Sequence, residues 1–353
     1  MNNKSLGAVP SVRAATGPRE AVIAEPPPRV AVIVPCFRAG ATVAGVVAAI
    51  GPEVDRIYVV DDGCPEASGA ALEGTASDPR LVVLRNPRNL GVGGALKRGY
   101  KAALEDGAEI LVKLDADGQM DPAHIPRLVA PLVSGRADYA KGNRFAPPHR
   151  MPPGSDPKAA ATMPPLRRLG NNILSFFHKG VTGYWNIVDP ANGYTAIHRR
   201  AVESIDLEAV ADCYFFETDL LFQLNLVDAV VTDVPLPARY AGEVSSLGIR
   251  KVLLRFPGLS LKRFVKRIWT KYFLQDFNVA SFEMLVGLPL IVLGGAFGVY
   301  KWWVAVETGV AASAGSVMFA ALPIIIGFQL LLSAVSYDIS RTPSAPISRR
   351  GEG

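Results

Sequence analysis

Ile110-Leu111-Val112-Lys113-Leu114 runs directly into Asp115-Ala116-Asp117-Gly118-Gln119. A short apolar run that ends in turn-forming residues is typical of a buried strand. Two carboxylates one residue apart at the end of such a strand repel each other unless a divalent cation lies between them. Their hard oxygen ligands suit Mg²⁺ or Mn²⁺. An Asp-X-Asp sequence also occurs in turns and helix caps. This stretch alone therefore predicts a strand end that either binds a cation or only forms a turn or cap.

Further apolar runs at 30–34, 57–60 and 81–84 precede this strand and alternate with helix-like stretches at 42–50 and 94–104. Such alternation is typical of an α/β domain with a mainly parallel sheet. The carboxyl ends of parallel strands meet at one edge of the sheet, where ligands bind. Each apolar run ends in polar residues: Pro35-Cys36, Asp61-Asp62-Gly63, 86–89 and 115–117. We therefore expect these four loops to share one cleft.

The glycine-rich stretch Asn89-Leu90-Gly91-Val92-Gly93-Gly94 differs from a dinucleotide-binding fingerprint. Leu96 replaces the third glycine of that fingerprint, and the loop follows the third strand rather than the first. The glycines open a helix whose amide end can face a phosphate, with Lys97 one turn into the helix. They could equally serve only to let this helix pack closely, so the sequence leaves both roles open.

The 353 residues are 49% apolar and 20% charged, which excludes a chain that is disordered throughout. We expect a disordered arm at 1–28 and an α/β domain at 29–249. Within that domain, 145–165 contains seven prolines, a composition that predicts a linker or a substrate lid. The three cysteines are far apart, so neither a disulfide framework nor a zinc site is predicted.

Two charge-free stretches, 284–300 and 308–337, predict transmembrane helices at 281–300 and 310–337. The segment 250–275 before them is basic and amphipathic, which favours an anionic membrane surface. The tail 338–353 is also basic, so the positive-inside rule predicts that both flanks of the hairpin are cytoplasmic. The net charge of +5 is mild, and we expect membrane lipids rather than nucleic acid as partners.

Several of these motifs occur in an order that resembles the family 2 glycosyltransferases of GT-A fold. The resemblance covers about 29–250 and is strongest to the dolichyl-phosphate mannose synthase-like branch, whose members glycosylate polyprenyl phosphates. The motifs are Val30 to Pro35, Val59 to Gly63, Asn89 to Gly93, Asp115 to Gln119 and Gly142-Asn143-Arg144. The apolar hairpin is similar to that of bacterial members that act on undecaprenyl phosphate.

The resemblance implies roles for individual residues of this chain. Donor-binding roles fall on Pro35, Phe37, Asp62, Asn89, Lys97, Asp115, Ala116, Asp117, Arg144, Arg239 and Ser245. Asp115, Asp117 and Gln119 would hold Mg²⁺ or Mn²⁺, and Asp117, Arg144, Asp189, Glu217 and Asp219 would be catalytic. Glu217 and Asp219 could bind sugar hydroxyls or pair within the fold. An acceptor phosphate is already ionised at neutral pH, so a general base is not obligatory.

The resulting expectation is an inverting, metal-dependent transfer of a hexose-type sugar from GDP-mannose or a UDP-sugar to a polyprenyl phosphate. The reaction would occur at the cytosolic face of a bacterial inner membrane, and the sequence is compatible with a homo-oligomer. One alternative is a membrane polysaccharide synthase, although Arg267-Ile268-Trp269 is all that matches the Gln-x-x-Arg-Trp motif of such enzymes. The other is a catalytically silent, membrane-anchored protein that binds nucleotide sugars.

Overall fold

A computed structural model describes most of the chain outside the first 26 residues. The described residues are 27–40, 42–66, 68–73, 78–153, 165–190, 192–237 and 249–349. The predicted arm at 1–28 therefore lies, apart from its last two residues, outside the described part of the chain.

The central sheet has seven strands in the order β3-β2-β1-β4-β6-β5-β7. The strands are β1 (Val30–Cys36), β2 (Arg56–Asp61), β3 (Leu81–Arg85), β4 (Ile110–Lys113), β5 (Tyr139–Asn143), β6 (Thr195–His198) and β7 (Val231–Pro235). All neighbouring strands pair in parallel except β6, which is antiparallel to both β4 and β5. This confirms the predicted α/β domain with a mainly parallel sheet.

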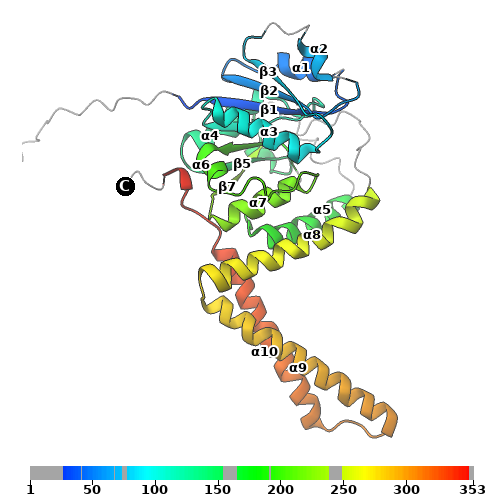
Figure 1. The fold of residues 1–353 in the computed structure, drawn as a ribbon. Helices are drawn as coiled ribbons and strands as arrows, with labels where there is room; N and C mark the ends of the chain where they lie inside the picture. The colour runs from blue at the N-terminus through cyan, green and yellow to red at the C-terminus, as the bar shows by residue number, and fades with distance from the viewer. Residues whose placement is uncertain are drawn as a thin grey trace, which may run out of the picture.

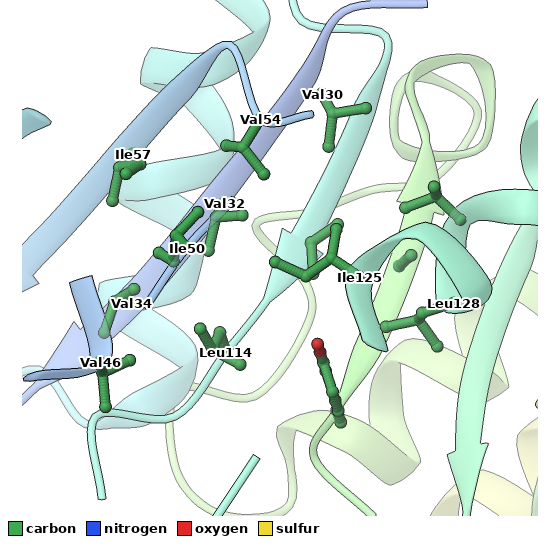
Figure 2. Close-up of a cluster of buried hydrophobic side chains, with 14 of the residues drawn as sticks. Val30, Val32, Val34, Val46, Ile50, Val54, Ile57, Leu114, Ile125 and Leu128 are labelled. Carbon is green, nitrogen blue, oxygen red and sulfur yellow. The ribbon is translucent and has the colours of Figure 1, made fainter. Parts of the chain in front are cut away.

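Helices cover both faces of the sheet. They are α1 (Val43–Ala48), α2 (Ser68–Glu73), α3 (Val92–Glu105), α4 (Ile125–Val133), α5 (Pro165–Thr182), α6 (Arg199–Glu203) and α7 (Phe216–Leu226). Successive residues of a strand point to opposite faces, so β1 contributes to two apolar cores. Val32 packs in one core with Ile125 and Leu128 of α4 (Figure 2). Ile33 packs in the other with Tyr100 of α3 and further residues of α7.

The hairpin consists of α9 (Val279–Thr308) and α10 (Ala314–Ser340), which project away from the α/β domain (Figure 1). Both helices are long and apolar enough to cross a membrane. At about 1.5 Å per residue they exceed the roughly 30 Å hydrocarbon core of a bilayer. A Cβ added at Gly287 would lie only 2.9 Å from the carbonyl oxygen of Gly327, so the missing side chains let the two helices pack closely.

Helix α8 (Ile249–Trp269) and the π-helical turn η3 (Thr270–Gln275) join the α/β domain to the hairpin. In Figure 1, α5 and α8 lie side by side between the sheet and the hairpin, and their residues are in contact. After α10 the chain returns to the α/β domain, where the backbone N–H groups of Ile347 and Ser348 donate to the carboxylate of Asp138. Both ends of the hairpin therefore lie on the side of the α/β domain.

Candidate functional site

A single cavity of about 2660 Å³ begins at the carboxyl ends of β1, β2 and β4 and continues to the base of the hairpin. This volume exceeds the 300–1,000 Å³ that is usual for a site that binds one small molecule. Ten of the predicted site residues line it: Pro35, Phe37, Asp62, Asn89, Asp115, Ala116, Asp117, Gln119, Arg144 and Glu217. The topology thus brings together side chains that are far apart in the sequence.

Asp115 and Asp117 follow β4 and line the cavity. One oxygen of Asp117 accepts a hydrogen bond from the backbone N–H of Gln119 at 2.9 Å, which fixes the turn. Among the residues that the structure describes, no three His, Cys, Asp or Glu side chains gather as a metal site. A pair of carboxylates nevertheless fits Mg²⁺, which commonly takes one or two protein carboxylates and completes its shell with substrate phosphates and water.

Two buried lysines that are not among the predicted site residues lie beside this acidic motif. Lys113 Nζ is 2.9 Å from Oδ1 of Asp115 and 3.0 Å from Oε1 of Glu217. Lys141 of β5 lies 3.6 Å from the other oxygen of Glu217 and donates to the carbonyl of Asn192. Burial by itself would raise the pKa of Glu217, but Lys141 and Lys113 outweigh it and lower that pKa. Lys113 in an otherwise apolar strand is the feature of the sequence that could have indicated this pair, because a buried charge needs a partner of opposite charge.

Arg144, at the end of β5, is held by Asp189. Its Nε lies 2.8 Å from one carboxylate oxygen and its Nη2 lies 3.1 Å from the other, which makes a bidentate pair. Asp189 is 1% exposed, whereas the Arg144 side chain is 32% exposed and lines the cavity. The structure therefore places Asp189 behind Arg144, where it orients the guanidinium group rather than facing the cavity itself.

Asp62 joins the end of β2 to the glycine-rich loop. Its Oδ1 accepts from the backbone N–H of Leu90 at 2.9 Å, and its Oδ2 accepts from that of Gly91 at 2.8 Å. Asn86 donates a third hydrogen bond, at 2.6 Å. Gly91 has φ +87°, a conformation that favours glycine at the start of α3. Asp62 lines the cavity, as predicted, while its carboxylate fixes the shape of the neighbouring loop.

Besides Asp189, two predicted site residues that the structure describes do not line the cavity. Lys97 of α3 is buried, where it pairs with Asp212 at 2.7 Å. Asp219 pairs with Arg263 of α8 at 2.6 Å and accepts from the backbone N–H of Ala211. Asp219 is two residues from Glu217, and side chains two positions apart point to different sides of a helix. Asp219 thus joins α7 to α8. Arg239 and Ser245 lie outside the described residues.

The far end of the cavity is apolar and was not predicted. Phe176 and Phe177 of α5 line it together with Leu261 and Phe264 of α8, and Leu285 of α9 extends the lining into the hairpin. Phe177 is 64% exposed and Leu261 is 63% exposed. Exposed apolar side chains gathered in this way are typical of a surface that binds an apolar partner.

His178 lines the cavity where its polar and apolar parts meet. Its Nε2 lies 2.9 Å from the hydroxyl of Thr218, and burial lowers the pKa of its imidazole. The sequence did not indicate a role for His178, because no other histidine or cysteine lies at the spacing of a metal site.

Comparison with known proteins gives a consistent result. Residues 31–206 match the family described as glycosyl transferase family 2. The chain is 32% identical over 238 residues to polyprenol monophosphomannose synthase of Mycolicibacterium smegmatis, covering 65% of this chain and 84% of that protein. It is 31% identical over 187 residues to undecaprenyl-phosphate mannosyltransferase of Micrococcus luteus, covering 52% and 72%. It is 26% identical over 199 residues to UDP-N-acetylglucosamine–dolichyl-phosphate N-acetylglucosaminyltransferase of Methanococcus voltae, covering 53% and 75%.

Among solved structures, mannosyl-3-phosphoglycerate synthase from Rubrobacter xylanophilus is similar with a TM-score of 0.49 and 17% identity, covering 71% of this chain and 77% of that one. The sheet order, the acidic motif after β4 and the family match over the α/β domain agree with one another. On these grounds the chain belongs to glycosyl transferase family 2 and is a glycosyltransferase of GT-A fold whose two C-terminal helices are candidate membrane spans.

Proposed function

We propose that this glycosyltransferase transfers a hexose-type sugar, with inversion, from GDP-mannose or a UDP-sugar to a polyprenyl phosphate. The observation that carries the proposal is the single cavity, which joins the polar strand ends to an apolar groove along α5, α8 and the hairpin. A nucleotide sugar fits the polar end, and an isoprenoid chain fits the apolar end. The three named relatives act, by their names, on polyprenol-, undecaprenyl- or dolichyl-linked acceptors, and two of them transfer mannose.

Asp115, Asp117 and Gln119 are the proposed ligands of Mg²⁺ or Mn²⁺. When bound, such a cation would stabilise the departing nucleoside diphosphate as a Lewis acid. Pro35, Phe37 and Asn89 would contact the nucleotide. Arg144, oriented by Asp189, is suited to pair with a phosphate through its planar guanidinium group.

The acceptor phosphate already carries the negative charge that a nucleophile needs, so Glu217 has no proton to remove. We propose instead that Glu217 bridges Lys113 and Lys141 and holds these charges in fixed positions beneath the reacting groups. Catalysis would then rest on positioning and on preorganised charges.

The proposed location is a bacterial inner membrane, with the α/β domain and both termini in the cytosol. Lys262 and Lys266 of α8 lie on the same helix as the exposed Leu261, Val265 and Trp269, as expected for a helix at a membrane surface. Each basic residue near an anionic surface contributes roughly 1 kcal/mol of attraction. The proline-rich stretch 145–165, of which 154–164 lie outside the described residues, is proposed as the substrate lid.

The test is transfer of radiolabelled sugar from a panel of UDP and GDP donors to undecaprenyl phosphate, with purified protein and with Mg²⁺, Mn²⁺ or EDTA. Cation-dependent label in the organic phase is the expected result. Label only in an aqueous polymer would instead identify a polysaccharide synthase. Absence of transfer with every donor, combined with binding of a nucleotide sugar, would identify a silent binding protein. The Asp117→Asn variant serves as the matched inactive control.

A further inference from the structure

A buried carboxylate at the base of the hairpin gathers four segments of the chain. Asp338, near the end of α10, is 9% exposed and lines the same cavity as the acidic motif. Arg267 of α8 donates to both of its oxygens, at 2.7 Å and 3.0 Å. Tyr272 of η3 donates to one oxygen at 2.5 Å, and Trp185, which follows α5, donates to the other at 2.8 Å. Each oxygen thus accepts two hydrogen bonds, which uses the acceptor capacity of an ionised carboxylate.

The donors of Asp338 are themselves fixed. Arg267 is 2% exposed and also donates to the carbonyl of Gly180 in α5 at 2.8 Å. The ring of Trp185 packs edge-to-face on Phe176, with 5.8 Å between ring centroids. Both helices that form the apolar groove, α5 and α8, are therefore tied to α10 through one carboxylate.

We propose that Asp338 is a positioning residue for the lipid acceptor. It fixes the position of α5 and α8, which form the groove, relative to the hairpin, so that a membrane-embedded polyprenyl phosphate reaches the polar end of the cavity. This inference rests on the proposed function. Asp338 acts through Arg267, Trp185 and Tyr272 and does not contact the reacting atoms. An ionised side chain near the end of an otherwise apolar helix is costly unless it is paired, and Asp338 is paired with donors from the two segments that carry the groove.

The experiment compares two acceptors. One is undecaprenyl phosphate in phospholipid nanodiscs, which must be delivered from the bilayer. The other is geranyl phosphate, a short isoprenyl phosphate that is supplied from solution. For Asp338→Asn we expect the KM for undecaprenyl phosphate to rise roughly tenfold, equivalent to about 1.4 kcal/mol. The donor KM and the kcat with geranyl phosphate should stay within about twofold of the wild type.

Two further variants make the result decisive. Trp185→Phe keeps the packing on Phe176 but removes one hydrogen-bond donor, so it should raise the same KM roughly threefold through loss of one bond to a charged group. Asp276→Asn removes the exposed ion pair with Arg341 and serves as the control. It should change the KM for neither acceptor, since exposed ion pairs contribute little to stability.

Equal losses with both acceptors in Asp338→Asn and Trp185→Phe would mean that the cluster only stabilises the fold, and this would overturn the inference. Unchanged kinetics in both variants would overturn it as well. If the wild type transfers sugar to neither acceptor, the proposed function itself fails, and the inference falls with it.

Discussion

The carboxylate of Glu217 lies 3.0 Å from the Nζ of Lys113 at the floor of the cavity. With Lys141 on its other side, Glu217 has a lowered pKa and is ionised at neutral pH. The charges of Lys141 and Lys113 are what lower this pKa against the effect of burial. The sequence left open whether Glu217 binds sugar hydroxyls or pairs within the fold, and the structure shows it paired with Lys113 and Lys141.

Replacement of Glu217 by Gln should lower kcat roughly 100-fold, equivalent to about 2.7 kcal/mol, because it leaves two buried lysines with too little negative charge. The shape of the pH–rate profile between about pH 5.5 and 8 should not change, since Glu217 does not titrate there. The measurement is kcat against pH for the wild type and the variant. Glu203→Gln, at an exposed ion pair with Arg199, is the control. Loss of the acidic limb of the profile in Glu217→Gln would show that Glu217 is a base after all.

Asp117→Asn should abolish transfer while the protein stays folded and bound to the membrane. Asn retains the side-chain oxygen that accepts from the N–H of Gln119, so the turn survives, but it removes a negative charge from the proposed cation site. The assay measures transfer with saturating Mn²⁺, alongside thermal unfolding. Turnover near that of the wild type would contradict the assignment of Asp117 as a metal ligand.

The ion pair of Arg144 and Asp189 should behave as one unit. Arg144→Lys loses the bidentate geometry, and Asp189→Asn loses the charge that orients the guanidinium group. Each should lower kcat/KM roughly 30-fold, equivalent to about 2 kcal/mol. The double variant should be little worse than either single variant, because both remove the same interaction. Fully additive losses in this double-mutant cycle would show that Asp189 has a separate function.

The sequence was sufficient to predict the sheet, the cleft and the apolar hairpin, because each depends on local patterns of apolar and polar residues. The strand that ends at Lys113 and the acidic motif after it could be predicted from adjacent residues alone. The pairing of Lys113 with Glu217 joins residues 104 positions apart, and no local pattern encodes it. Likewise Glu217 and Asp219 look equivalent in the sequence, but the helix turns one toward the cavity and the other toward Arg263.

Asp233 should make the protein less stable as the pH rises. Burial raises its pKa to about 6, the charge of Asp189 adds to this effect, and the N–H of Val188 opposes it. In the unfolded chain an aspartate titrates near 3.9, so between about pH 4 and pH 6 the folded state binds more protons. Stability is therefore lost over that interval as the pH increases. The change should be on the order of 1–2 kcal/mol, smaller than the full shift implies because Asp233 is only partly buried.

Asp233→Asn should remove this contribution. The wild type should lose stability relative to the variant between pH 4 and pH 6.5, and thermal unfolding in detergent at a series of pH values measures the difference. Equal pH dependence of the two proteins would mean that Asp233 is ionised in the folded state throughout.

The C-terminal tail should stabilise the α/β domain from the side opposite the cavity. Asp138 is fully buried and accepts from the N–H groups of Val230, Ile347 and Ser348 at 2.8, 2.9 and 2.9 Å. Deletion of 346–353 removes two hydrogen bonds to a charged acceptor, at a cost of about 2–3 kcal/mol. For a chain of 353 residues the Tm should fall by roughly 3–4 °C.

Asp138→Asn tests whether the carboxylate is the reason for that cost. Deletion of the tail should destabilise the Asp138→Asn protein much less than the wild type, because the interaction has already been weakened there. An equal fall in Tm in both backgrounds would place the stabilising contact elsewhere in the tail. The same deletion also bears on topology: docking on Asp138 requires that the end of α10 and the α/β domain share one side of the membrane. A protease added to that side of sealed vesicles should therefore cleave the tail faster in Asp138→Asn, and addition to the other side should leave it intact.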